Sequence, residues 1–336
     1  MRSNRRQESH ASPAGSPLAS LAPPAGSPLA SLAPRAGRGL GEGLHGLLVF
    51  NKHLGPSSNR ALQDLRRLLG GVKAGHAGTL DPAASGVLLV LLGEAAKLVP
   101  FLADLEKEYR GVARFGAETD TQDAAGEVTA RAAWEHLDEA QLRAALAGFL
   151  GESLQEPPMY SALQVGGQRL YDLARAGREV ERASRRIAVS SFELLSWRPP
   201  DAEFLVRAGS GTYVRTLCRD LGLRCGSMAH LAALTRTAVG PFRLEDAVTL
   251  EQLDAQPPGA PVPGLVRLAD AVGHLPAVLL DPAAARGILD GRAPLLPGVA
   301  PGTTVRLLDG EGRLLAIARA GATGEPAPIL RGFREP

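Results

Sequence analysis

The pattern of apolar and polar positions predicts a folded region that begins near residue 46. Continuous apolar runs at 46–50 and 87–91 predict two buried strands. Between these strands, Leu62, Leu65 and Leu69 are spaced to form the apolar face of a helix, which two glycines end. The first part of the folded region therefore combines strands with a helix.

The chain continues with the same mixture of elements. Apolar residues at helical spacing predict further helices at 94–105, 139–150 and 213–221. Short apolar or alternating runs predict further strands at 110–115, 187–195 and 203–208. Because the order lacks the regular β–α–β alternation of a doubly wound sheet, we expect an α+β fold.

The first 44 residues have a different character. The segment Pro13–Pro23 (PAGSPLASLAP) is repeated without change as Pro24–Pro34. A stretch so rich in proline, glycine, serine and alanine, without aromatic residues, cannot bury enough surface to offset the entropy of ordering. We therefore expect residues 1–44 to be a disordered low-complexity tail.

A second change of composition lies near the other end. Proline and glycine become frequent at 256–264, which predicts a domain junction. Short strands are predicted beyond it at 277–280, 304–308 and 314–318. The sequence thus predicts a large domain over 45–270 and a small β-rich module over 275–336.

Composition sets only broad limits on function. The formal net charge of the 336 residues is +2, so a basic face for a polyanion is neither indicated nor excluded. Apart from four lysines every basic residue is arginine; arginine suits phosphate groups, although GC-rich coding explains this bias more simply. Cys218 and Cys225 form no CxxC pair and cannot supply four zinc ligands. No apolar run approaches the roughly 20 residues of a membrane span, so we expect a cytoplasmic protein with reduced thiols and no membrane segment.

The loop at 75–82 (GHAGTLDP) is the first candidate for chemistry. Gly75 and Gly78 permit unusual backbone conformations and close approach of a ligand. Pro82 keeps Asp81 out of helical geometry, directly before a predicted buried strand. Asp81 is either a reactive carboxylate or an aspartate that only shapes the turn.

Two further segments carry candidates. In the segment 211–216 (GTYVRT), Arg215 lies near the start of a predicted helix, where it could pair with a reactive carboxylate or be an ordinary surface arginine. In 107–110 (KEYR), Tyr109 is one of only four tyrosines. A tyrosine can stack on a base while its hydroxyl handles a proton, but a core or rim position is the commoner role.

Segments in a fixed order resemble the motifs of the TruB family of pseudouridine synthases. The strongest is residues 75–88 (GHAGTLDPAASGVL). The others, in chain order, are 50–58, 93–97, 107–110, 119–124, 158–163, 211–216 and 229–231. The resemblance covers about residues 46–250, and so many ordered matches make coincidence very improbable.

The resemblance implies a role for each matched residue. Asp81 matches the nucleophilic aspartate, Tyr109 the tyrosine that stacks on the target uracil and helps to move its C5 proton, and Arg215 the arginine that orients the aspartate. A further set matches positions that bind the substrate: His76, Tyr213, Leu234 and Lys52. No metal and no other cofactor is implied.

The resemblance also implies a fold and a reaction. It predicts a catalytic domain over 45–270 with a central mixed, mainly antiparallel sheet flanked by helices, an RNA-gripping insertion at 159–186, and a PUA-like RNA-binding module at 275–336. The implied reaction converts uridine 55 in the tRNA T loop to pseudouridine after base flipping, through attack at C1′ or through a glycal. We expect a monomer without a protein partner.

The chain departs from the family pattern at three positions. His53 replaces the usual proline, Asn51 replaces a frequent aspartate, and Thr235 replaces the first of two arginines, which leaves Arg236 and could weaken one phosphate contact. Two other functions remain open at this stage. One is a pseudouridine synthase that acts on another RNA, and the other is an RNA-binding or RNA-folding protein with secondary isomerase activity.

Overall fold

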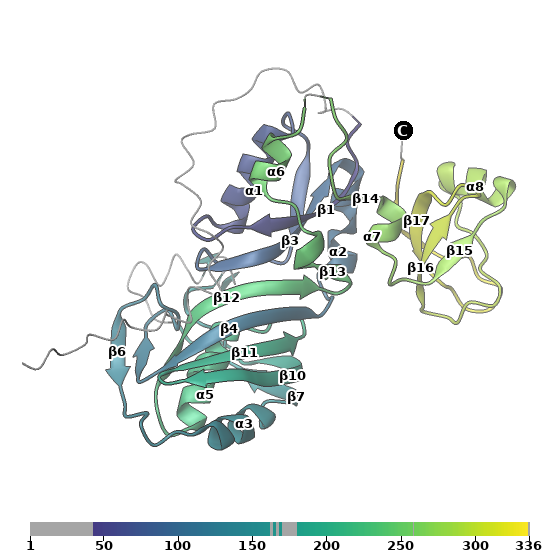
Figure 1. Ribbon diagram of the computed structural model, residues 1–336. Coiled ribbons are helices and arrows are strands. Elements are labelled where there is room, and N and C mark those ends of the chain that lie inside the picture. The colour runs from purple at the N-terminus through teal and green to yellow at the C-terminus, as the bar shows by residue number, and fades with distance from the viewer. Residues whose placement is uncertain (1–42, 162–163, 166–167, 170–179, 258, 335–336) are drawn as a thin grey trace, which may run out of the picture.

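The computed structural model describes residues 43–334 apart from 162–163, 166–167, 170–179 and 258. A large domain built on one long sheet carries a small C-terminal module at its side (Figure 1). The tail expected at 1–44 lies almost entirely outside the described residues, and so does much of the insertion expected at 159–186.

A ten-stranded sheet forms the centre of the large domain. Its strands, in spatial order, are β14 (Leu265–Val266), β1 (Gly46–Lys52), β3 (Ala84–Leu92), β12 (Ala229–Val239), β4 (Lys107–Phe115), β11 (Asp201–Ala208), β10 (Arg185–Arg198) and β7 (Gly151–Gln155). Two short strands pair at the side of this path, β2 (Ala74–Ala77) with β3 and β13 (Phe242–Arg243) with β12. Only the β3–β12 pair is parallel among the described strands of this sheet. The predicted α+β fold with a mixed, mainly antiparallel sheet is confirmed.

Helices cover one face of the sheet along its whole length. Helices α1 (Ser58–Leu68) and α6 (Leu250–Asp254) pack on the β1–β3 half, and α3 (Glu139–Ala147) and α5 (Val214–Arg224) pack on the other half. Along β3, Ala84 joins the apolar cluster under α5, whereas Leu88 and Val90 join the cluster under α1. Even-numbered residues of one strand share a face, so both pairs of helices lie on the same side.

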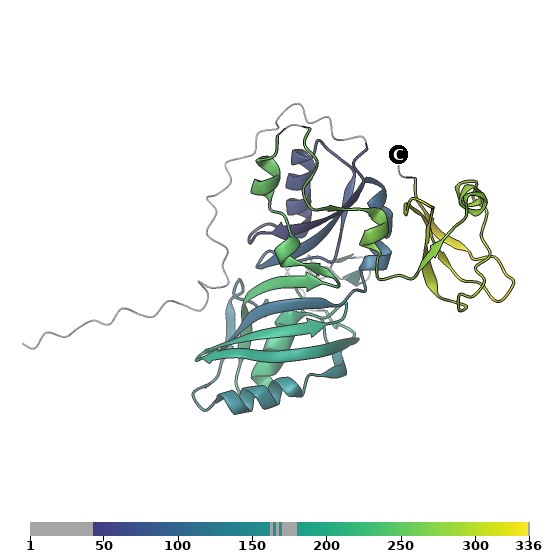
Figure 2. The same ribbon diagram turned by 45° about the vertical axis from the view of Figure 1, so that its right-hand side comes forward.

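The opposite face differs between the two halves. Over β1 and β3 it is covered by the 3₁₀ helix η2 (Gly93–Leu98), α2 (Val99–Leu102) and α7 (Leu268–Ala271) (Figure 2). Over β4 and β11 it carries ion pairs, among them Arg114 with Asp201 at 2.7 Å. The helix predicted at 94–105 is therefore wrong as a single element. Pro100 has no backbone N–H to donate, and the segment forms a 3₁₀ turn and one α turn instead.

Smaller elements complete the large domain. Strands β5 (Ala117–Thr119) and β6 (Val128–Arg131) form one hairpin, and β8 (Gln164–Val165) and β9 (Gln168–Arg169) form another. A single 3₁₀ turn, η3 (Leu244–Asp246), follows β13. Helix α1 begins after Ser57, because the Ser57 side chain accepts a hydrogen bond from the Arg60 amide.

The C-terminal module is a four-stranded sheet with one helix. Its strands run in the order β15 (Ala277–Leu279), β16 (Thr304–Leu308), β17 (Leu314–Arg319) and β18 (Ile329–Gly332), with α8 (Pro282–Leu289) packed beside them. The three strands predicted in this region are present. Phe333 and Leu314 share an apolar cluster with η2 and α2, and the Lys97 ammonium donates to the Gly332 carbonyl at 3.1 Å. The module is therefore docked on the large domain.

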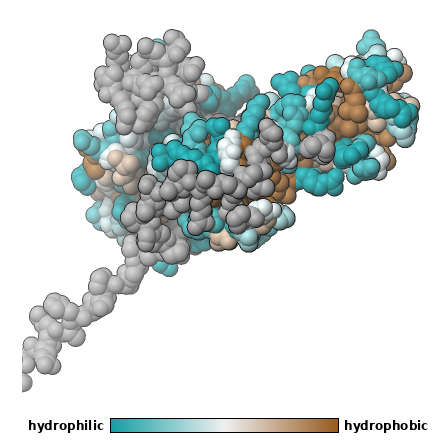
Figure 3. Space-filling model, turned by 90° about the horizontal axis from the view of Figure 1, so that it is seen from above, coloured by the Kyte–Doolittle hydropathy of each residue, from teal (hydrophilic) through white to brown (hydrophobic). Residues whose placement is uncertain are grey.

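The outer surface of the module is more apolar than its surroundings in the view of Figure 3. The module also has three exposed large apolar side chains, Leu279, Leu289 and Leu295. Across the described ranges, no helix is long and apolar enough to cross a bilayer.

The close approach of β3 and β12 gives a first prediction. Gly86 has φ +103°, and a Cβ added to it would lie 2.2 Å from the Arg236 carbonyl oxygen. Replacing Gly86 with alanine combines backbone strain with a clash against backbone. We expect Gly86→Ala to lower the free energy of unfolding by about 3 kcal/mol or more.

Gly209→Ala is the matched control, because a Cβ there would meet its nearest atom at 3.6 Å, an ordinary contact. Urea unfolding of both variants is the measurement. Equal midpoints for the two variants would contradict the close packing at Gly86.

Candidate active site

The loop between β2 and β3 places Asp81 just before the start of the buried strand β3. Hydrogen bonds from several directions hold the backbone of this loop. The Ser58 hydroxyl donates to the Leu80 carbonyl at 2.9 Å and accepts from the Leu80 amide at 2.8 Å. The Gly55 amide donates to the Pro82 carbonyl at 2.9 Å. The residues on both sides of Asp81 are thus fixed, while the Asp81 side chain itself is 43% exposed.

Arg215 is the direct partner of Asp81. Its Nη2 lies 2.9 Å from Asp81 Oδ2, and its side chain is only 6% exposed. The other donors are occupied, because Nη1 donates to the Thr121 carbonyl and Nη2 also to the Tyr160 carbonyl, each at 2.9 Å. Asp123 Oδ2 lies 3.7 Å from Nη1. The contact expected between Arg215 and Asp81 is present, and the guanidinium is fixed by a set of oxygen atoms.

Tyr109 and Leu234 belong to the apolar cluster on the helix-covered face, which also contains Leu80, the neighbour of Asp81. Tyr109 is half-buried on β4 and packs against the apolar cluster that contains Leu80 and Leu234. Leu234 lies on β12, where it is opposite Ala84 of β3. The structure therefore brings both residues to the apolar surroundings of the Asp81 loop.

His76 and Tyr213 are close in sequence to the reacting pair, His76 on β2 before the Asp81 loop and Tyr213 at the start of the helix that carries Arg215. His76 lies on β2, five residues before Asp81, with Nε2 3.3 Å from Asn59 Oδ1. Burial, and to a smaller extent the positive charge of Arg236, lower the pKa of His76, so the ring is neutral at pH 7. Tyr213 is the N-cap residue of α5, and its backbone is held by the Gln155 amide group at 2.8 and 3.1 Å. Both rings lie near the ends of elements that carry Asp81 and Arg215.

Lys52 is placed differently from the sequence-based expectation. The residue is 0% exposed, and its ammonium donates to the carbonyls of His53 at 3.0 Å and Pro56 at 2.9 Å. Burial lowers its pKa to about 8, with Asp81 acting in the opposite direction and Arg236 in the same direction. A direct contact of Lys52 with a substrate is therefore not supported. Its bond to a backbone carbonyl also explains why histidine can replace proline at position 53.

Two supporting positions were missed in the sequence. Arg236 was noted only as the arginine left beside Thr235 and was given no role, but it is 1% exposed and donates to the carbonyls of Val87, Gly78 and Thr79. Gln122 has φ +62° and accepts a hydrogen bond from Thr216, the neighbour of Arg215, at 2.9 Å. The available signal for Arg236 was a charged residue inside an otherwise apolar, strand-length segment.

The geometry limits the chemistry of the site. A half-exposed carboxylate is held by a buried guanidinium and lies beside an aromatic and apolar wall. Such a carboxylate can act as a nucleophile or take a proton from a bound substrate. Over the described ranges, no three His, Cys, Asp or Glu side chains are grouped to hold a metal ion.

Solved structures of similar fold include chains of two complexes. A Cbf5-Nop10-Gar1 complex contains a chain that matches with a TM-score of 0.69 and 26% identity, over 86% of this chain and 85% of that one. A chain in the structure of an H/ACA RNP bound to a substrate RNA containing 2′-deoxyuridine matches with a TM-score of 0.68 and 25% identity, over 86% and 85%.

Relatives found from the sequence share more residues with this chain than these structures do. The model of the TruB family pseudouridylate synthase N-terminal domain matches residues 66–214, and that of the tRNA pseudouridylate synthase B C-terminal domain matches 215–257. The tRNA pseudouridine synthase B of Aromatoleum aromaticum is 46% identical over 284 residues, which are 84% of this chain and 91% of that protein. The enzyme of the same name from Cupriavidus metallidurans is 47% identical over 289 residues, or 82% and 90%. This chain belongs to the TruB family of pseudouridylate synthases.

Proposed function

We propose that the chain isomerises uridine to pseudouridine in the T loop of tRNA, at position 55, with Asp81 as the nucleophile. The ion pair of 2.9 Å between the half-exposed Asp81 and the buried Arg215 is the observation that carries this proposal. Relatives named tRNA pseudouridine synthase B match over four-fifths of the chain, which supports tRNA as the substrate.

The reaction explains why a fixed carboxylate is needed. The bond between C1′ and N1 breaks, the uracil turns, and a bond between C1′ and C5 forms, with loss of the C5 proton and gain of a proton at N1. There is no net oxidation or reduction. A carboxylate at this place can attack C1′ to form an ester or take the C2′ proton to give a glycal, and either route divides one difficult step into easier ones. Both require an oxygen that Arg215 has already aimed.

Tyr109 and Leu234 provide the surface for the base. The target base must leave the RNA stack, which costs a few kcal/mol. Stacking of a base on an aromatic ring returns about 1–3 kcal/mol, and Tyr109 offers such a ring next to the apolar cluster around Leu80 and Leu234. Its hydroxyl is then placed to help remove the C5 proton. We assign His76 and Tyr213 to contacts with the flipped region of the RNA, because they flank the loop and the helix that carry the reacting pair.

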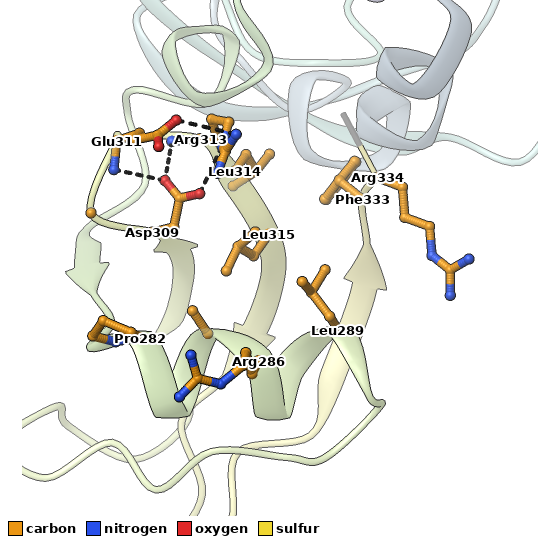
Figure 4. A pocket seen from close by; sticks show the side chains of 12 residues that line it. Pro282, Arg286, Leu289, Asp309, Glu311, Arg313, Leu314, Leu315, Phe333 and Arg334 are labelled. Carbon is orange, nitrogen blue, oxygen red and sulfur yellow. Dashed lines mark hydrogen bonds and ion pairs between the residues drawn. The ribbon is translucent and has the colours of Figure 1, made fainter. Parts of the chain in front are cut away.

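The C-terminal module offers a second place for RNA. A cavity of about 740 Å³ lies between α8, the β16–β17 hairpin and the end of β18 (Figure 4). Leu289, Leu315 and Phe333 contribute apolar walls, and the exposed Arg286 and Arg334 line its edge. We assign this PUA-like module to RNA affinity, because the reacting groups all lie in the large domain. We further propose that the enzyme works as a monomer without a protein partner.

Lys52 is assigned a supporting role. Its ammonium fixes the turn at 53–56 and contributes positive charge near Asp81. In this role it acts on the carboxylate and on the turn, and not on the RNA.

The first test of the proposal is Asp81→Asn. The change keeps the shape of the side chain but removes its charge and nucleophilicity, so we expect at least a thousandfold loss of pseudouridine formation with tRNA affinity within about twofold. Asp138→Asn is the control, because Asp138 caps α3 and asparagine is an equally good cap. Pseudouridine yield and filter binding at one salt concentration are measured. If Asp81→Asn keeps a tenth of the wild-type rate, Asp81 only shapes the turn.

A second test uses the pH dependence of Lys52. Because its pKa is lowered to about 8, the ammonium loses its proton as the pH rises through 8, and the positive charge beside Asp81 is lost. We expect the single-turnover rate to fall above pH 8 in the wild type. In Lys52→Arg the fall should move upward by more than one pH unit, because arginine stays protonated. If the two proteins show the same dependence of the single-turnover rate on pH, Lys52 does not influence the reaction.

A third test concerns the cavity of the C-terminal module. Deletion of the module would expose the cluster that contains Leu314 and Phe333, so point changes are the cleaner experiment. Arg286→Ala combined with Arg334→Ala should weaken tRNA binding about tenfold and reduce the salt slope of log K by roughly 2. The single-turnover rate at saturating enzyme should stay unchanged.

Arg292→Ala serves as control for the double variant, because Arg292 belongs to the same module but pairs with Asp290 outside the cavity lining. If the control and the double variant bind tRNA with equal affinity, this cavity does not take part in RNA binding. A large fall of the single-turnover rate would also contradict the assignment of the module to affinity alone.

A further inference from the structure

Arg236 is the largest of the fully buried side chains in the described part of the chain. It lies on the central strand β12, and its guanidinium extends toward the Asp81 loop. Nε donates to the Val87 carbonyl at 2.7 Å, Nη2 to the Gly78 carbonyl at 2.9 Å and Nη1 to the Thr79 carbonyl at 3.4 Å. One side chain thus binds the loop at two consecutive residues and the following strand at a third.

The loop needs such a partner because it lies outside the sheet. Strand β2 ends at Ala77 and β3 begins at Ala84, so the residues between them have no neighbouring strand to receive their hydrogen bonds. A partly buried carbonyl without a donor is unfavourable, and the bonds from Arg236 to Gly78 and Thr79 are partly buried. Arg236 supplies donors to the first half of the loop, and Ser58 supplies both a donor and an acceptor to Leu80. Together they determine the path of the backbone immediately before Asp81.

The burial of Arg236 indicates a specific role. Within the described ranges, no carboxylate forms an ion pair with Arg236. A buried charge that is balanced only by carbonyl dipoles is a costly way to hold a strand. An apolar side chain would suffice for packing at this position. The feature that only arginine provides is a planar set of donors that reaches three carbonyls at once.

The effect on Asp81 follows from distance along the chain. Thr79 is two residues before Asp81, and Gly78 is in the left-handed region with φ +79°. Asp81 itself is held by its ion pair with Arg215 and by a hydrogen bond from the Ala84 amide to its carbonyl at 3.1 Å. If the segment at 78–79 shifted, the carboxylate would move relative to Arg215 and to a bound ribose. A displacement of about 1 Å at a reacting group can cost roughly a hundredfold in rate.

We infer that Arg236 is a positioning residue for the isomerisation, which acts by fixing the backbone of the Asp81 loop from beneath. This inference rests on the proposed function. A direct contact of Arg236 with the RNA is ruled out, because its side chain is only 1% exposed.

The test compares Arg236→Lys and Arg236→Gln with the wild type. Lysine keeps the charge but can reach fewer of the three carbonyls, and glutamine removes the charge as well. We expect the single-turnover rate constant at saturating enzyme to fall about tenfold in Arg236→Lys and about a hundredfold in Arg236→Gln. The dissociation constant for tRNA should change by no more than about twofold, because the phosphate-contacting surface is untouched.

Arg114→Lys and Arg114→Gln are the matched controls. Arg114 is on the adjacent strand β4, but it pairs with Asp201 on the sheet face opposite the reacting pair. Both control variants should keep the wild-type rate constant. Enzyme is in excess over tRNA in this assay, so a partly unfolded preparation leaves the rate constant unchanged as long as its folded fraction still saturates the tRNA.

Two further readouts separate positioning from mere stability. Arg236 is one of the causes that lower the pKa of Lys52, so the alkaline fall of the rate should move to higher pH in Arg236→Gln. Ser58→Ala loosens the same loop from the other side. Its penalty should combine with that of Arg236→Lys less than additively, since both changes release one segment.

The outcomes are distinct. If wild-type protein does not form pseudouridine in tRNA, the proposed function is wrong and this inference is wrong with it. If the wild type is active and the Arg236 variants keep its rate constant while melting at lower temperature, Arg236 only stabilises the fold and the inference alone is overturned. If Arg236→Gln does not fold, the result of Arg236→Lys decides. If neither folds while both Arg114 variants do, Arg236 is a structural residue and the inference is likewise overturned.

Discussion

The ion pair between Asp81 and Arg215 is the constraint on which the site depends. A guanidinium with 6% exposure is stable only if its donors are occupied, and the carbonyls of Thr121 and Tyr160 supply acceptors from two separate loops. Asp81 completes the set. Residues far apart in the sequence must therefore assemble before the carboxylate has its partner. The half-exposed carboxylate is then presented to solvent from an otherwise buried network.

The order of strands explains how these loops meet. Strands β3 and β12 run parallel, so the Asp81 loop, at the start of β3, lies beside the part of β12 that carries Leu234 and Arg236. The contact of Gly86 with the Arg236 backbone permits this approach. Strand β4 is the other neighbour of β12 and carries Tyr109 opposite Arg236 in the register. One strand thus brings together the support of the loop and the aromatic wall of the site.

Much of the fold could be predicted from the sequence because most elements show a clear apolar period. Examples are the strand ending at Leu92, helix α1 with its leucine face, and the strands of the C-terminal module. Strand β12 was not predicted, although it is central. Its sequence, AHLAALTRTAV, is rich in alanine and contains only one valine and no isoleucine, the residues typical of strands. Alanine is accepted there because neighbours on both sides approach closely, which is a tertiary property that a local pattern does not contain.

The candidate site shows the same division. Asp81, Tyr109 and Arg215 could be named from motifs, because their residue types are tied to the chemistry that the family performs. Lys52 and Arg236 could be located but not interpreted. Both are cations in apolar or mixed segments, and a sequence suggests solvent or phosphate as the partner of a cation. The structure gives them backbone carbonyls instead. Which partner a charged side chain takes depends on the path of loops that are distant in the sequence.

The buried cations also show that the geometry of the site lowers the stability of the fold. Burial, with a smaller contribution from the charge of Arg236, lowers the pKa of both Lys52 and Lys107 to about 8. Arg236 repels both lysines, so the arrangement reduces stability below pH 8, where both lysines carry charge. Such a conflict between local charge and burial is expected at functional sites and not in an ordinary core. This loss of stability has a reason in the loop itself. No neighbouring strand holds the backbone of the loop, and the carboxylate that it carries must stay open to the substrate.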